Sequence, residues 1–165
     1  MQIINQAIEK FQHMQDELCP PLFAMLREIN ALEKEFRERS ERIDAQYLST
    51  TEPNPAPDAT PNMWAEYRER YGKIVYDKCT EKLLKNYYYG GSLSSPPQYA
   101  YIDGECEVTF TMKAPKRAVI ETHYALCSSV DSRHRFTLIN DNDKWLLTSV
   151  EHCNNRDTVW HRGSI

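Results

Sequence analysis

The sequence predicts an α+β fold in which N-terminal helices pack on an antiparallel sheet formed by the C-terminal third. Four runs are rich in β-branched and aromatic residues, and apolar and polar side chains alternate along each run. These runs are residues 106–112, 116–127, 133–139 and 144–150. Their short connections favour antiparallel neighbours. Apolar residues at three- and four-residue steps earlier in the chain predict the helices.

The alternation also predicts which side chains the sheet buries. Val108, Phe110 and Met112 share one face of the first run, because side chains on a strand repeat with a period of two. In the last run, we expect Trp145 to be a buried core residue. The Asn140-Asp-Asn-Asp143 tract joins the last two strands and lacks the distal Glu of a calcium loop, so we expect a plain hairpin turn there.

Helical spacing in the first half predicts two consecutive helices. The first covers residues 2–18 and ends at Cys19-Pro20-Pro21, because the residue before a proline is disfavoured in the α region. The second begins at Pro21 and runs to about Leu48. Its apolar stripe thins beyond Phe36, and we interpret the charged residues that follow as a solvated helix end rather than a coiled-coil surface.

A third helix is predicted after a proline-rich segment. Residues 49–62 contain several prolines and no large apolar residue before Met63, which predicts a loop or linker. Thr60-Pro61 then resembles a helix start, and one apolar side continues through Cys79 to Leu84. Acidic residues offset the basic ones on this helix, which argues against RNA binding. Residues 98–102 are predicted to be a short strand.

These elements suggest an order of units along the chain. Residues 1–48 form a helical hairpin or extension, and residues 49–62 form the proline-rich loop. Residues 63–153 form the α+β domain, and residues 154–165 form a loose tail.

Composition excludes several classes of function. The net charge is −4, which does not provide the positively charged surface that binds nucleic acid or an anionic membrane. The charge is uneven, because residues 1–62 carry 6 Lys/Arg against 11 Asp/Glu. The 5 cysteines are scattered without a Cys-x-x-Cys pair, so neither a disulfide framework nor a zinc site is expected, and free thiols suit a reducing compartment. With no signal peptide or membrane span in the sequence, we expect a cytoplasmic protein.

One pair of residues has the chemistry for catalysis. Glu121 and His123 share a face of their predicted strand and could act as acid and base or help to hold a metal. A solvent-facing polar stripe is the favoured interpretation, because a third ligand is missing. The sequence therefore predicts no catalytic residues, no metal and no cofactor.

The last two strands resemble a known superfamily. Residues 133–139, the turn at 141–143 and residues 145–150 are similar to the closing hairpin of the nuclear-transport-factor-2-like (cystatin-like) fold, in which a Trp begins the last strand. The resemblance covers roughly residues 63–153 and implies a curved sheet that wraps a long helix around a cone-shaped cavity. Within the superfamily, the chain resembles immunity proteins of bacterial polymorphic toxin systems, which are small, tyrosine-rich and non-catalytic. Isomerase and dehydratase relatives carry Asp/His or Asp/Tyr sets in the cavity, and no such set maps onto this sequence.

The resulting hypothesis is a non-catalytic cytosolic immunity protein that binds and neutralises a cognate toxin domain. The candidate partner-binding residues are Tyr87, Tyr88, Tyr89, Asp141 and Asp143. The three tyrosines follow one another at a helix end, so at least one leaves the core, and aromatic residues are effective interface anchors. The alternative is a small-molecule-binding protein or an isomerase/dehydratase-type enzyme that uses the cone cavity. A homodimer is compatible with both hypotheses.

Overall fold

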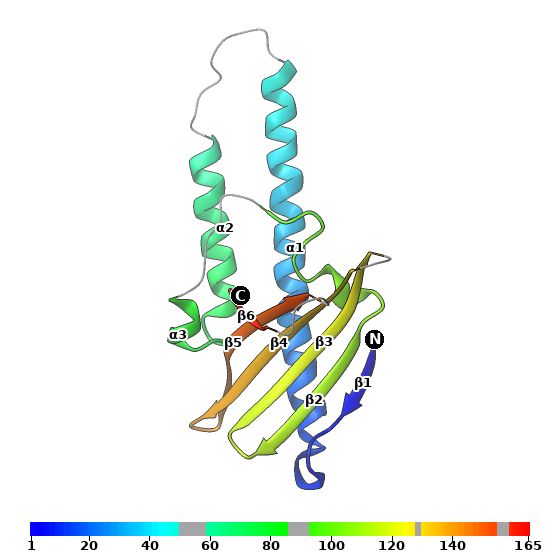
Figure 1. Cartoon of the computed structure of the whole chain (residues 1–165). Helices are drawn as coiled ribbons and strands as arrows, with labels where there is room; N and C mark the ends of the chain where they lie inside the picture. Colours follow the sequence, from blue (N-terminus) through cyan, green and yellow to red (C-terminus); the bar gives the residue numbers. More distant parts are fainter. Residues whose placement is uncertain (50–58, 86–92, 128–129, 155–158) are drawn as a thin grey trace.

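Four long antiparallel strands form the centre of the sheet (Figure 1): β2 (Glu107–Ala114), β3 (Arg117–Cys127), β4 (Val130–Asp141) and β5 (Lys144–Asn154). The computed structural model describes residues 1–49, 59–85, 93–127, 130–154 and 159–165. Within these residues, β1 (Gln2–Asn5) and β6 (His161–Gly163) complete a six-stranded sheet in the order β1-β2-β3-β4-β5-β6. Only the β1–β2 pair is parallel among the strands described. The predicted α+β class and the four predicted strands are confirmed.

The predicted inner face of the sheet is also confirmed, with one exception. Val108, Phe110 and Met112 are buried, and across the ladder Phe110 pairs with Ile120, which is also buried. Trp145 is the exception, because it is only half-buried at the beginning of β5 and packs on the margin of the core. The expectation of a buried core residue therefore holds only in part, since one side of its indole faces a surface hollow.

The predicted helix over residues 2–18 is wrong in its first half. Gln2–Asn5 form β1 instead, and the Gln2 amide donates to the Cys106 carbonyl at 3.1 Å. After the strand, the Ala7 amide donates to the Asn5 side chain at 3.0 Å, which turns the chain. A 3-10 turn, η1 (Glu9–Phe11), then leads to the long helix. Strand pairing with an edge more than 100 residues away therefore overrides a local helical pattern.

The predicted break at the two prolines is also wrong. A single helix, α1 (Met14–Ser49), runs through Pro20 and Pro21. Neither proline has an N–H, so the carbonyls of Asp16 and Glu17 lose their usual i+4 donors, at a cost of about 3 kcal/mol or more per interior proline. Both prolines are exposed, so these carbonyls can face water, while Leu18, Cys19, Leu22 and Phe23 remain buried on the opposite side. Burial of that face keeps the helix intact.

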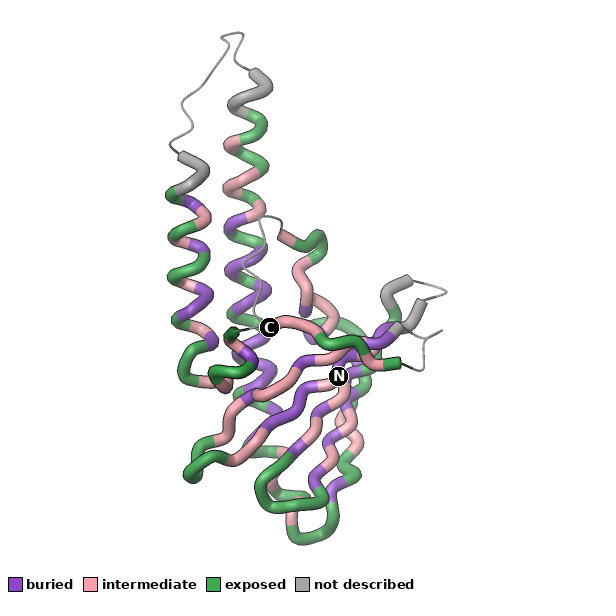
Figure 2. Tube along the Cα trace, turned by 60° about the vertical axis from the view of Figure 1, so that its left-hand side comes forward, coloured by how far each residue is buried: buried purple, intermediate pink, exposed green. Residues whose placement is uncertain are grey.

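α1 serves two parts of the fold. Its 36 residues correspond to a rod about 54 Å long, because each residue adds about 1.5 Å. The N-terminal half lies against the inner face of the sheet, and the C-terminal half projects beyond the sheet beside α2 (Ala59–Val75) (Figure 1). Buried positions on α1 extend from the sheet into this projecting hairpin and thin out toward its end (Figure 2). A single cluster of buried side chains joins both halves.

The predicted third helix is interrupted. α2 ends at Val75, and residues 76–80 cross to the sheet, where the Thr80 amide donates to the Leu147 carbonyl at 2.9 Å. The Leu147 amide in turn donates to the Lys78 carbonyl at 2.9 Å. A short helix, α3 (Glu81–Leu84), follows with Thr80 as its N-cap. The apolar side that was expected on one continuous helix is therefore divided between α2, this bridge and α3.

Two further expectations require correction. The predicted strand at residues 98–102 is instead a 3-10 turn, η2 (Ala100–Asp103), which packs beside α1. The predicted loose tail contains β6, and its final residue, Ile165, is buried. Most of the proline-rich loop, residues 50–58, lies outside the described residues. None of the helices that the structure describes is long and apolar enough to span a membrane.

Candidate functional site

The predicted acidic turn between β4 and β5 is exposed. Asp141 and Asp143 both lie at the surface. Asn142 and Asp143 have positive φ angles of 51° and 62°, and the Asp143 amide donates to the Asn140 side chain at 3.0 Å. This geometry fixes the turn. Both carboxylates are exposed, and Asp141 Oδ1 accepts a hydrogen bond from Asn142 Nδ2 at 3.0 Å. The other candidate partner-binding residues, Tyr87, Tyr88 and Tyr89, lie outside the described residues.

Glu121 and His123 lie on the outer face of the sheet, away from the helices. Glu121 accepts a hydrogen bond from Arg135 Nε at 2.5 Å, and Arg135 Nη1 lies 3.8 Å from Glu151. The Arg135 guanidinium also lies 3.8 Å from the centre of the Trp160 ring. Glu121 is thus held in a cross-strand ion pair, which suits a structural role better than proton transfer. His123 is exposed and stands opposite Glu107 on the neighbouring strand.

The inner face of the sheet is filled by stacked aromatic rings. Tyr101 and Tyr124 stack with ring centres 3.7 Å apart and planes 2° apart. The His134 ring lies parallel to both, at 5.3 Å from Tyr101 and 5.8 Å from Tyr124. Tyr99 packs edge-on against His134 at 5.8 Å and is fully buried. These side chains come from η2, β3, β4 and the residue preceding η2, and they close the space between sheet and helix.

The electrostatics of this cluster favour neutral side chains. Burial, together with the nearby His152, lowers the pKa of His134 from 6.5 to about 4. Burial raises the pKa of Tyr99, Tyr101 and Tyr124 above the usual value for a phenol. The Tyr124 hydroxyl contacts His134 Nδ1 at 3.2 Å, and the Thr122 hydroxyl donates to the Tyr101 hydroxyl at 3.2 Å. The Tyr99 hydroxyl donates to the Ser164 carbonyl at 3.3 Å. The cluster is thus hydrogen-bonded and holds no charge near neutral pH.

Four of the cysteines have the properties of structural thiols. Cys19, Cys79, Cys106 and Cys153 are buried and unbridged. Burial raises the pKa of both Cys19 and Cys79 to about 12, so neither forms the thiolate that a nucleophile or metal ligand requires. Among the described residues, no group of three or more His, Cys, Asp or Glu side chains is arranged to hold a metal ion.

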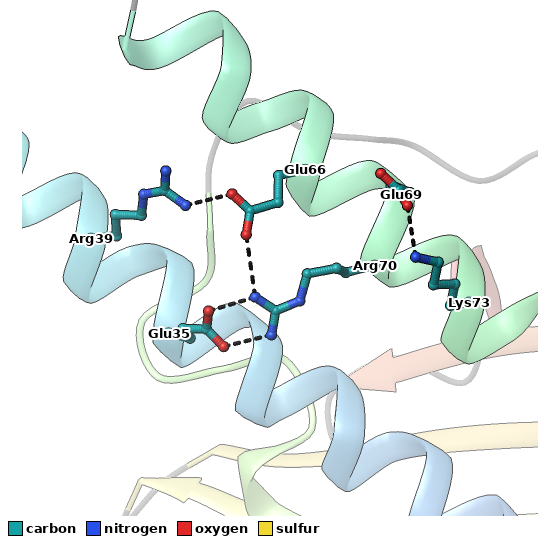
Figure 3. A network of polar contacts seen from close by, with 6 residues as sticks. All are labelled: Glu35, Arg39, Glu66, Glu69, Arg70 and Lys73. Atoms are coloured by element: carbon teal, nitrogen blue, oxygen red, sulfur yellow. Dashed lines mark hydrogen bonds and ion pairs between the residues drawn. The ribbon is translucent and has the colours of Figure 1, made fainter.

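The projecting hairpin of α1 and α2 carries a network of ion pairs (Figure 3). Arg70 Nη1 and Nη2 donate to the two Glu35 oxygens at 2.6 and 2.7 Å, and Arg70 Nη1 also lies 3.5 Å from Glu66. Arg39 donates to Glu66 at 2.6 Å. Each of these side chains is about 40–50% exposed, so each pair contributes at most about 1 kcal/mol. The network supplements the buried Phe36–Tyr67 contact that joins the two helices.

A surface hollow of about 240 Å³ lies between the N-terminal half of α1 and the β4–β5 hairpin. Its floor and walls are mainly apolar and are formed by Leu18, Leu22, Met25, Leu138, Trp145 and Leu147. Glu17, Pro21 and Lys78 complete the lining and bring the polar groups. The Lys78 ammonium lies 3.5 Å from the Glu28 carboxylate. We refer to this site as the α1–β5 hollow, and it has the form of a pocket for one apolar group.

Sequence reasoning missed both the aromatic cluster and the α1–β5 hollow. The hollow combines residues from α1, the bridge after α2, and two strands, so no local spacing reveals it. The inner-facing position of Tyr124 could be read from strand alternation, but its stacking partner Tyr101 lies on a turn that was predicted to be a strand. Asp141 and Asp143 are at the turn where the sequence placed them, in the same hairpin that supplies Trp145 to the hollow.

The chain was compared with known proteins in three ways. No family model matches it, no curated protein is significantly similar to it, and no solved structure matches it significantly.

Proposed function

We propose that this protein is a non-catalytic immunity protein of nuclear-transport-factor-2-like fold, which binds and neutralises a toxin domain of a polymorphic toxin system. The observation that carries the proposal is the filled inner face of the sheet. The fold that the sequence resembles keeps its cone-shaped cavity there, and enzyme relatives place their acid and base groups inside it. Here Tyr99, Tyr101, Tyr124 and His134 fill this region and are neutral.

Surface features add support for a protein partner. Asp141 and Asp143 project from a fixed turn, and the overall net charge is −4, which would favour encounter with a basic partner. The α1–β5 hollow, in the same hairpin, offers an apolar pocket of the type that anchors interface hot spots. Tyr87, Tyr88 and Tyr89 remain proposed anchors. A homodimer also remains a proposal, and light scattering on the purified chain measures it directly.

The proposal is tested by a pull-down with this chain from its native cells, followed by co-expression with any toxin domain that is recovered. We expect the chain to restore growth of cells that produce the toxin domain and to form a stable complex in gel filtration. A substitution of both Asp141 and Asp143 by Asn should reduce the association rate and its dependence on salt while leaving the melting temperature unchanged. If the chain neither binds the toxin domain nor restores growth, the proposal is wrong.

The alternative, a small-molecule-binding protein or enzyme, predicts a different result. A ligand or substrate that uses the inner face must displace the Tyr101–Tyr124 stack, so Tyr101→Ala would alter turnover or ligand affinity. The toxin-binding proposal predicts that Tyr101→Ala lowers stability and leaves the affinity of the folded protein for the toxin domain unchanged. Measuring both quantities on the same preparation separates the two functions.

A further inference from the structure

The size of the α1–β5 hollow limits what it can hold. An engineered apolar cavity of roughly 150 Å³ admits benzene. A hollow of about 240 Å³ therefore accommodates one aromatic ring or one branched aliphatic side chain, but not a helix or strand of a partner. Trp145 forms part of its wall, and its half-buried indole would become fully covered by such a group.

The rim of the hollow carries hydrogen-bond acceptors and excess negative charge. The Glu17 carboxylate has no ion-pair partner within the described part of the chain. Lys78 supplies the positive charge, but Glu28 lies 3.5 Å from its ammonium and offsets it. Pro21 has no N–H, so the Glu17 carbonyl one turn earlier lacks its usual helical donor. This carbonyl is a second hydrogen-bond acceptor at the rim.

Neighbouring residues extend the same charge. Asp16 precedes Glu17 on α1, and both are exposed. Asp143 is exposed in the turn, two residues before the lining residue Trp145. Asp141 and Lys144 pair at the end of the hairpin on the face opposite Trp145, because side chains alternate along a strand. An apolar group that enters the hollow therefore arrives at an acidic rim, which complements basic flanking residues.

We propose that the α1–β5 hollow receives an apolar side chain, phenylalanine in its simplest form, from a partner segment in which Lys or Arg flanks that residue. This inference rests on the proposed function, because the toxin domain is the protein that would supply the segment. The ring would pack against Trp145 and the leucines of the hollow, and the flanking cations would face Glu17 and its free carbonyl.

Three short peptides test the chemistry of the occupant without the toxin. They are acetyl-Lys-Phe-Lys-amide, acetyl-Ser-Phe-Ser-amide and acetyl-Glu-Phe-Glu-amide. The indole N–H signal of Trp145 is followed by NMR during titration and assigned with Trp145→Phe. We expect the basic peptide to shift this signal most and the acidic peptide least. The indole signals of Trp64 and Trp160 are internal controls, because neither residue lines the hollow.

A matched pair of proline variants tests the location. Pro21→Phe places a ring at the edge of the hollow and restores an N–H to the Glu17 carbonyl. It should lower the affinity for the basic peptide at least tenfold. Pro20→Phe is the control, because Pro20 is exposed on the same turn and does not line the hollow. The affinity of Pro20→Phe for the basic peptide should stay within twofold of the wild-type value. Both variants remove a proline from the helix interior, so neither should impair folding.

A second matched pair tests the charge. Glu17→Gln should reduce the preference for the basic peptide by up to about fivefold, the range expected for an exposed ion pair. Asp44→Asn removes one carboxylate from the exposed surface of the same helix, far from the hollow, and should have no effect. Binding of all three peptides with equal affinity, or no movement of the Trp145 signal with any of them, overturns the inference.

The toxin domain separates this inference from the proposed function. If the toxin domain binds wild-type protein and Pro20→Phe but binds Pro21→Phe at least tenfold more weakly, both stand. If it binds all three equally, the hollow is not the contact, and the proposed function survives. If it binds none of them, the proposed function fails. Binding of free indole with no preference for a basic peptide would instead assign the hollow to a small neutral ligand and overturn the inference.

Discussion

Acidification should destabilise the fold through His134, and the size of the effect follows from its burial. The imidazole is 8% exposed and stacked among tyrosines, and its pKa falls from 6.5 to about 4 because burial and His152 disfavour the charged ring. The unfolded chain therefore takes up a proton near pH 6.5, while the folded chain resists protonation until about pH 4. The stability that depends on neutral His134 is fully present above pH 6.5 and is lost as the pH falls toward 4.

The shift of about 2.5 pKa units corresponds to about 3 kcal/mol, at about 1.36 kcal/mol per unit. The assay is urea unfolding of the wild type and of His134→Gln at several values between pH 7 and pH 4. Glutamine does not titrate, so the difference in unfolding free energy between the two proteins should change by about 2–3 kcal/mol over this range, in favour of the variant at low pH.

The absolute stability of the variant is not diagnostic, because the substitution also removes ring stacking with Tyr101 and Tyr124. His123→Gln, which removes an exposed imidazole from the neighbouring strand, controls for the loss of a histidine as such. A constant free-energy difference between wild type and His134→Gln from pH 7 to pH 4 would refute the reasoning.

Three other predictions concern packing and charge. Trp145→Ala should cost about 2–3 kcal/mol by urea unfolding, below the 3–5 expected for a fully buried aromatic residue, because one side of the indole already faces the hollow; a neutral effect would contradict its packing on the core. Phe36→Ala should lower the free energy of unfolding by about 3–5 kcal/mol, since the ring is fully buried against Tyr67 at 5.2 Å. Circular dichroism and Trp fluorescence should report the same single transition if the projecting hairpin unfolds together with the sheet. Glu33→Gln should raise the melting temperature at pH 7 and not at pH 3. Burial raises the pKa of Glu33 despite the opposing Gln98 amide and Arg37, so the charged carboxylate destabilises the fold at pH 7 and is neutralised at pH 3. An equal effect at both pH values would exclude a charge-based cause.

The central strands were predictable because their signal is local. Alternation in the run containing Val108, Phe110 and Met112 fixes both the strand and its buried face, and the turn at Asp141–Asp143 is encoded by adjacent residues. The exposure of Asp141 and Asp143 was accessible to sequence reasoning for the same reason, and their role in partner binding stays a prediction. The candidate partner-binding tyrosines lie outside the described residues, so their role stays a prediction too.

The remaining features depend on contacts between distant segments. Ile3 and Ile4 fit a helix and a strand equally well, and only the free edge of β2 decides between them. Pro20 indicates a helix end when considered alone, but the burial of Leu22 and Phe23 against the core outweighs the loss of backbone hydrogen bonds. Neither the α1–β5 hollow nor the Tyr101–Tyr124 stack has a sequence signature, because each combines elements that are separated along the chain.

The way in which β5 is covered has a consequence for self-association. Its outer edge pairs with residues 78–80 at Leu147 and with β6 at Val150–His152, so much of its backbone is already engaged. On the opposite side, β1 is four residues long and ends at Asn5, whose side chain bonds the Gln12 carbonyl at 2.9 Å and turns the chain away. Short or occupied edges give another strand little template on which to add. In the described part of the chain, the sheet is thus protected against edge-to-edge growth into fibres, even though its central strands are long, apolar on one face and rich in β-branched residues.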